Sequence, residues 1–93
     1  MELTRRQEMM AMLRDCEWTL DELARNFVVS KKIIIDDLEH IARSVVRPSR
    51  LLIRPPICDH CGYRFKGRAR FSDPSRCPQC KNEHLSSQRF RIV

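Results

Sequence analysis

Four cysteines in two matched pairs are the residues of this chain best suited to chemistry. Cys58 and Cys61 form one Cys-x-x-Cys pair, Cys77 and Cys80 form the other, and fifteen residues separate the pairs. Two residues between cysteines suffice to bring both sulfurs to one side of a tetrahedral ion. The spacing predicts a four-thiolate site for one structural zinc ion, and iron held by the same thiolates is the alternative.

The competing interpretations of these cysteines are disulfides and ordinary free thiols. The segment Met-Glu-Leu-Thr-Arg-Arg at the start lacks the apolar core of a signal sequence, so we expect a cytoplasmic protein, in which disulfides rarely persist. Gly62 suits the first turn because glycine tolerates a positive φ, and Pro78 stiffens the second. Lys81 stands where such turns often have glycine. His60 and His84 are left out as ligands, because four cysteines complete a tetrahedron.

The basic surplus of the chain is local. The net charge is +6 over 93 residues, and residues 1–57 hold ten basic and nine acidic residues against eight and three in residues 58–93. Such a surplus suits contact with a few phosphates better than the wrapping of DNA. The sequence contains no apolar run near the ~18 residues of a membrane-spanning helix, so we expect no membrane partner.

The cysteine site also argues against an enzyme. Catalytic zinc keeps an open coordination position, whereas four thiolates fill this one. The sequence contains no Ser/His/Asp arrangement and no glycine-rich phosphate loop, and it holds two glycines in all. We therefore expect a protein without catalytic activity.

Three amphipathic helices are predicted before the cysteines. Thr4 and Thr19 each begin a capping box, and Ser30 caps a third helix. Apolar residues then recur at helical spacing, and Cys16, the last of the first stripe, is expected to be a buried thiol. The predicted stripes are Met9, Met12, Leu13 and Cys16, then Leu20, Leu23, Ala24 and Phe27, then Ile34, Leu38, Ile41 and Val45.

The second and third helices, joined by a turn of about four residues, match a helix-turn-helix. The face of the third helix opposite its apolar stripe mixes bases with acids and is almost neutral, which is unusual for a helix that enters the major groove. That face consists of Lys32, Asp36, Glu39, His40 and Arg43.

Two short strands flank the cysteines. Residues 51–54 are apolar and precede Pro55-Pro56, whereas residues 89–93 alternate, with Phe90 and Ile92 on one side. We predict that they pair antiparallel. The predicted fold class is α+β, a three-helix winged helix-turn-helix (residues 1–56 plus 85–93) with a small zinc ribbon (residues 57–84) inserted between the two wing strands.

A third strand is predicted from Tyr63 to Phe71, because apolar and basic residues alternate there with a bend near Gly67. Its basic face is either a phosphate-binding surface or a charged edge that discourages aggregation. That face consists of Arg64, Lys66, Arg68 and Arg70.

The chain resembles the archaeal predicted transcriptional regulators in which a winged helix-turn-helix carries a rubredoxin-like zinc ribbon in its wing. The residues that carry the resemblance are Cys-x-x-Cys-Gly-Tyr-x-Phe-Lys from position 58, Pro-Ser-Arg-Cys-Pro-x-Cys-Lys from position 74 and the closing Arg-Phe-x-Ile, together with Asp-Leu-Glu-His-Ile-Ala-Arg-Ser (37–44) and Leu-Leu-Ile-Arg-Pro (51–55). It implies zinc at Cys58, Cys61, Cys77 and Cys80, and a role in transcription.

Two functions are therefore expected. The first is a DNA-binding regulator whose phosphate contacts come from Lys31, Lys32, Arg43, Arg64, Lys66, Arg68 and Arg70. The second is a protein-interaction module that docks on RNA polymerase or another transcription factor, which the near-neutral third helix and the modest net charge favour. No additional dimerisation helix is visible in the sequence.

Overall fold

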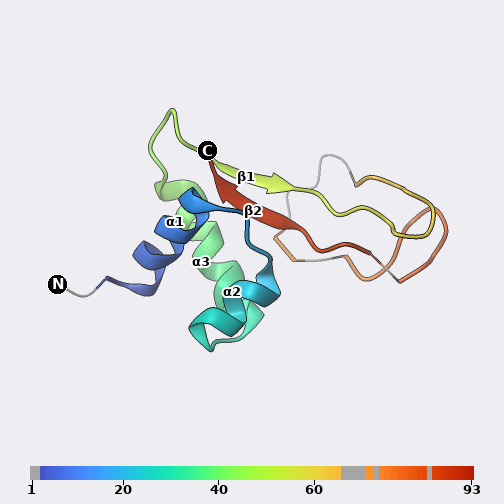
Figure 1. Ribbon diagram of the computed structural model, residues 1–93, viewed down its shortest axis with the longest axis horizontal. Helices are drawn as coiled ribbons and strands as arrows, with labels where there is room; N and C mark the ends of the chain where they lie inside the picture. Colours follow the sequence, from blue (N-terminus) through green and yellow to red (C-terminus); the bar gives the residue numbers. More distant parts are fainter. Residues whose placement is uncertain (1–2, 66–70, 73, 84) are drawn as a thin grey trace.

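The computed structural model describes residues 3–65, 71–72, 74–83 and 85–93. Three helices gather at one end of an elongated molecule of 49 × 30 × 19 Å, and two strands lead from them to loops at the other end (Figure 1). None of the helices in these residues is long and apolar enough to cross a membrane. In chain order the elements are α1 (Arg5–Asp15), α2 (Leu20–Phe27), α3 (Lys31–Ser44), β1 (Leu51–Arg54) and β2 (Arg89–Ile92).

The predicted helix starts are confirmed by their hydrogen bonds. The Thr4 hydroxyl accepts from the Gln7 amide (3.2 Å) while the Gln7 side chain accepts from the Thr4 amide (2.8 Å). Thr19 and Glu22 make the same reciprocal pair at α2, and the Ser30 hydroxyl accepts from the amide of Ile33 at α3. Each cap satisfies amides that have no partner inside the helix.

The turn between α2 and α3 contains an unusual residue. Val28 ends α2 in the left-handed region, with φ 55° and ψ 50°, and its side chain is 87% exposed. A β-branched residue seldom adopts this conformation, because its Cβ crowds the following carbonyl at a cost of about 1–2 kcal/mol. Val29 and Ser30 complete the turn that the sequence predicts.

One hydrophobic core joins the helices to β2. Every fully buried apolar residue of this core lies on a predicted stripe or strand face, which confirms the periodicity. Two of them, Phe90 and Ile92, belong to β2 and follow the cysteines in the chain, so the helical core needs the last strand. The core residues are Met9, Leu13, Leu20, Leu23, Ile34, Leu38, Ile41, Phe90 and Ile92.

The prediction that Cys16 is buried is wrong, because its side chain is exposed. Cys16 is the C-terminal cap of α1, and its backbone is extended, with φ −156°. The projection of 100° per residue holds only within the helix, so the side chain leaves the apolar face at this position.

The predicted antiparallel pairing of the two strands is confirmed, and so is the α+β class. Leu51 lies opposite Ile92, and Ile53 lies opposite Phe90. On the other edge of β2, Trp18 and Phe90 exchange backbone hydrogen bonds of 3.0 and 2.8 Å. The strand β2 therefore lies between β1 and the segment that connects α1 to α2.

A buried carboxylate, which the sequence reasoning missed, connects α1 to α3. Asp37 is 1% exposed and accepts hydrogen bonds from the guanidinium groups of Arg5 and Arg6, the latter at 2.9 Å. Burial acts to raise the pKa of Asp37, but these hydrogen bonds outweigh it and hold the pKa below its usual range. The ion pairs fasten the start of α1 to the middle of α3.

Candidate metal centre

Two backbone turns of similar geometry carry the four cysteines. In the first turn the Gly62 amide donates to the Cys58 carbonyl (2.9 Å), and in the second the Lys81 amide donates to the Cys77 carbonyl (2.9 Å). Gly62 has φ 76° and Lys81 has φ 66°. The turn therefore requires a positive φ after each pair, which glycine adopts without strain and lysine does not.

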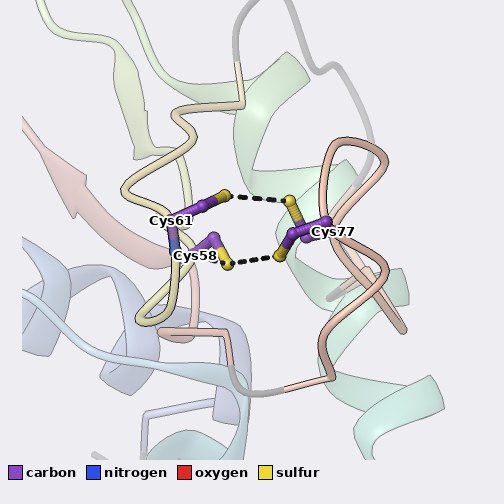
Figure 2. Close-up of side chains that lie close together, drawn as sticks. Cys58, Cys61 and Cys77 are labelled. Carbon is purple, nitrogen blue, oxygen red and sulfur yellow. Dashed lines mark hydrogen bonds between the residues drawn. The ribbon is translucent and has the colours of Figure 1, made fainter.

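The two turns bring four sulfurs together. Figure 2 shows the thiols of the two turns pointing toward one another across the gap between them. The Cys58 sulfur lies 3.6 Å from that of Cys80, and the Cys61 sulfur lies 3.6 Å from that of Cys77. All four sulfurs lie within 4.8 Å of one another.

These distances suit one tetrahedral ion. With metal–sulfur bonds of about 2.3 Å, a tetrahedron has sulfur–sulfur edges of about 3.8 Å. Four thiolates complete the coordination shell and leave no open position for substrate or water, which is the arrangement of a structural zinc site. Within the described part of the chain, no other group of His, Cys, Asp and Glu side chains is close enough to hold a metal.

Backbone amides prepare the sulfurs of the leading cysteines for binding. The Cys61 amide donates to the Cys58 sulfur (3.5 Å) and is the largest of the hydrogen bonds that, against burial, lower the pKa of that thiol to about 6. Burial acts to raise the pKa of Cys77, but the amides of Cys80 and Gln79, together with the neighbouring thiols, outweigh it and lower the pKa. Hydrogen bonds to the charged form stabilise the thiolate, which is the form that binds a metal.

The other two thiols show the opposite behaviour. The Tyr63 amide acts to lower the pKa of Cys61, but desolvation and the neighbouring thiols raise it to about 12. The pKa of Cys80 is also raised, although the amide of Asn82 acts to lower it. Four negative charges so close together repel one another, and a divalent cation at their centre removes that repulsion.

Short bridges attach the site to the sheet. After β1, Ile57 pairs with Arg64 and Cys58 pairs with Leu85. The Ile57 amide also donates to the Ser86 hydroxyl (2.7 Å), and the Ser86 amide donates to the Ile57 carbonyl (2.9 Å). The first cysteine turn therefore continues the pairing of β1 with the chain that returns to β2.

A second attachment joins the far part of the ribbon to the core. Gln88 is fully buried, and its side-chain amide donates to the carbonyls of Phe71 (3.2 Å) and Ser72 (2.8 Å). The centroid of the Phe71 ring lies 5.9 Å from the centroid of the Phe90 ring. Sequence reasoning missed Gln88, because a single glutamine in a polar stretch carries no signal of burial.

The predicted nucleic-acid contacts fall into two separate groups. On α3, Lys31 forms an ion pair with Asp21 (2.8 Å), and Lys32 and Arg43 are exposed. Arg64 is exposed at the start of the ribbon, where it pairs with Ile57 just beyond the end of β1. The remaining predicted contacts, Lys66, Arg68 and Arg70, lie outside the described residues, as does most of the predicted strand from Tyr63 to Phe71.

Comparisons with known proteins match both parts of the chain to described families. A family described as PF0610-like, N-terminal, matches residues 4–53, and the PF0610 rubredoxin-like zinc β-ribbon domain matches residues 55–93. The solution NMR structure of protein PF0610 from Pyrococcus furiosus is 35% identical to this chain. The match covers 96% of this chain and 88% of that one, with a TM-score of 0.77. No curated protein matches.

The zinc ribbon and the sulfur geometry agree on the cofactor, which is one structural zinc ion. Iron, the alternative that the cysteine spacing leaves open, is not favoured by this match. Both matched segments together span nearly the whole chain. The chain therefore belongs to the PF0610-like family, with the rubredoxin-like zinc β-ribbon in its second part.

Proposed function

We propose that this chain is a DNA-binding transcription regulator, a winged helix-turn-helix protein with a structural zinc ribbon set into its wing and no catalytic activity. The observation that carries the proposal is that the paired strands pack on α1 and on the segment that leads into α2, next to the two helices joined by a short turn. The turn of residues 28–30 joins the two helices, and β2 lies between β1 and the bridge at Trp18. A helix-turn-helix with such a small sheet beside it is the arrangement of winged-helix DNA-binding domains.

The exposed face of α3 supports contact with phosphates more than the reading of bases. Lys32 and Arg43 are exposed on it, but Asp36 is exposed there as well and Glu39 is half-buried beside them. Acids close to the bases weaken the attraction of this helix for DNA. We therefore expect modest affinity and little sequence preference from α3 alone.

The closed metal site supports a structural role for the ion. Its four sulfurs complete a tetrahedron, so the zinc holds the ribbon in shape and offers no position for a substrate. In this proposal the ion maintains the basic ribbon next to the sheet.

Fluorescence anisotropy with a labelled DNA duplex tests the proposal. We expect the zinc-loaded full chain to bind at low salt and to lose affinity steeply as salt rises, because bound phosphates release counterions. The double variant K32Q/R43Q should reduce the slope of log K against log salt by about 1.8 if both side chains neutralise phosphates. No measurable affinity at low salt would refute the proposal.

A second candidate function, docking on RNA polymerase or another transcription factor, is favoured by one observation. Val28, in the turn between α2 and α3, is 87% exposed, and Ile33, in the first helical turn of α3, is 39% exposed. Val28 also lines a shallow surface hollow, together with Asp21, Ala24, Arg25, Val29 and Ser30. Exposed apolar side chains next to a hollow suit a protein partner better than DNA.

Affinity purification from the native host distinguishes the two candidates. If the protein docks through this surface, RNA polymerase subunits or a transcription factor should be recovered with the wild type and lost with V28S/I33S. The variant V46S is the matched control, because Val46 is 79% exposed outside the hollow. Recovery that V28S/I33S does not change would reject docking at the turn.

A further inference from the structure

The outer face of the two-stranded sheet carries a group of arginines that the sequence reasoning did not consider together. Burial alternates along both strands, so that Phe90 and Ile92 face the core while Arg89 and Arg91 are exposed. In β1 the exposed residues are Leu52 and Arg54. These four exposed positions hold three arginines, one leucine and no acidic residue.

The pairing of the strands brings these arginines together. Arg54 lies directly opposite Arg89, and Leu52 lies directly opposite Arg91. Residues opposite each other in an antiparallel pair have Cβ atoms ~5 Å apart, and alternate residues along a strand are ~7 Å apart. The three arginines therefore form a compact basic face on the sheet.

Little of this charge is neutralised by neighbours. The exposed Arg54 forms an ion pair with the half-buried Glu17, at 3.3 Å. Over the part of the chain that the structure describes, neither Arg89 nor Arg91 takes part in an ion pair. Like charges directly opposite each other destabilise a strand pair, so the opposition of Arg54 and Arg89 weakens a sheet of only two strands.

Solubility does not explain this composition. A polar outer face of mixed charge would keep the sheet wet equally well and would add favourable cross-strand pairs. All three cations are arginine, whose planar guanidinium binds phosphate oxygens with two parallel hydrogen bonds. The face contains no aromatic residue on which a base could stack, so it suits phosphates and not exposed bases.

We propose that this outer face of β1 and β2 binds the phosphate backbone of duplex DNA, independently of its sequence and apart from the exposed face of α3. The inference rests on the proposed function and names a surface for it. Four strand residues span ~13 Å, a length over which one strand of duplex DNA carries about four phosphates. The number of arginines on the face is therefore comparable with the number of phosphates on one DNA strand.

The face continues toward the zinc ribbon. Arg54 and Arg64 line one shallow surface hollow together with Pro55 and Ile57. The backbone pairing of Ile57 with Arg64 holds Arg64 at this place. In Figure 1 the two strands lead directly from the helices to the ribbon, so one DNA segment can follow the sheet and reach the ribbon at its end.

The test measures DNA binding by the zinc-loaded full chain and its variants at increasing salt concentrations. Binding is monitored by the fluorescence anisotropy of a labelled duplex. We expect R91Q to reduce the slope of log K against log salt by about 0.9, and R89Q/R91Q to reduce it by about 1.8. The variant R14Q is the matched control, because Arg14 is an exposed arginine on α1 and its loss changes the net charge equally. R89K/R91K should keep most of the slope, because lysine retains the charge.

Thermal unfolding separates this role from a structural one. Because Arg89 and Arg91 are exposed, R89Q/R91Q should keep the melting temperature of the wild type or raise it, since the variant removes the repulsion between Arg54 and Arg89. A large fall in melting temperature would mean that the arginines support the fold, and it would overturn the inference.

The outcomes distinguish the inference from the proposed function. If the wild type binds DNA and R89Q/R91Q keeps its affinity and salt slope, the sheet face is not the site and the proposed function stands. If R14Q lowers the slope as much as R91Q, the contact is not located on the sheet and the inference fails. If the wild type does not bind at low salt, both are rejected.

Discussion

The helical part of this protein and its ribbon are stabilised in different ways. In the helical part, side chains from α1, α2, α3 and β2 form one buried apolar cluster. Among the described residues from 57 to 85, only Cys58 and Cys77 are buried. A segment this small cannot bury enough apolar surface to fold alone, so a metal supplies the missing stabilisation. Within one short chain, the helical part offsets the conformational entropy lost on folding by burying apolar side chains, and the ribbon offsets it by binding a metal.

The two parts meet at the sheet, and neither is complete without it. Phe90 and Ile92 complete the helical core, although they follow the ribbon in sequence. Gln88 and Phe71 connect the far side of the ribbon to that core. The ribbon is therefore an insertion between two paired strands, and its metal also limits how far apart those strands can move.

Removal of zinc should produce the largest effect on stability. This effect should be concentrated in the ribbon and not in the helical part. We expect chelation, or the variant C77S, to unfold the ribbon, because structural zinc contributes an apparent ~10–16 kcal/mol to small sites at neutral pH. Amide hydrogen exchange should accelerate first in residues 57–65 and 74–83, then in β1 and β2, and last in the helices.

Elemental analysis supplies the control for this prediction. C16S should retain one zinc per chain, because Cys16 is exposed on α1 outside the site, whereas C77S should lose it. Unchanged exchange in residues 57–65 after complete removal of the metal would show that the ribbon folds without an ion.

Phe90→Ala should test whether the helical core depends on the strand after the ribbon. Phe90 is fully buried in the core cluster, and truncation of such a residue costs about 3–5 kcal/mol. Chemical denaturation monitored by circular dichroism measures this loss. Leu52→Ala is the control on the outer face of the same sheet, where a change within about 0.5 kcal/mol is expected. Equal effects of the two substitutions would contradict the proposed core.

Asp37→Asn should weaken the helical part by about 1–3 kcal/mol, because hydrogen bonds to a charged group contribute on this scale. Asp36→Asn, at an exposed neighbour, should change stability by less than about 0.5 kcal/mol. Urea denaturation at neutral pH gives both values. Equal stability of the two variants would show that the Asp37 ion pairs contribute nothing net.

The same carboxylate predicts the direction of a pH dependence. The pKa of Asp37 is lower in the folded protein than its usual value, so its contribution is fully present above the unfolded pKa of about 3.9. It is lost as the pH falls through the folded value. The difference in stability between wild type and Asp37→Asn should therefore shrink below about pH 4, and a difference that grows there would contradict this assignment.

Val28→Asn should produce the smallest effect and should stabilise the protein. Val28 has a left-handed backbone at the end of α2, and asparagine tolerates this conformation better than a β-branched residue. We expect a gain of about 1 kcal/mol in thermal unfolding. Val46→Asn, at another exposed valine, should change stability by less than about 0.5 kcal/mol. A loss at Val28 would indicate that its side chain makes contacts that outweigh the strain.

Local signals in the sequence were sufficient for most of the secondary structure and for the cysteine cluster. Thr4, Thr19 and Ser30 begin helices because their side chains bond to amides within the next turn. Cys58 and Cys61 meet on one turn because two intervening residues leave little freedom. The antiparallel pairing of residues 51–54 with 89–92 followed from two short strands that each required a partner.

Other features depended on contacts between distant segments. The burial of Asp37 was not visible, because its partners Arg5 and Arg6 lie more than thirty residues away on α1. Gln88 is buried for the same reason, through its bonds to Phe71 and Ser72. Cys16 was misplaced because helical periodicity ends with the helix, and its backbone is already extended.

By itself, the sequence determined where helices begin, which faces are apolar and which four thiols can share an ion, since these depend on spacing within a few residues. Only the tertiary structure decided that Arg54 lies opposite Arg89 on an exposed sheet face, and that a carboxylate is buried between α1 and α3. The physical reason is that strand register and burial of charge arise from packing between segments far apart in the chain, where no local spacing rule applies.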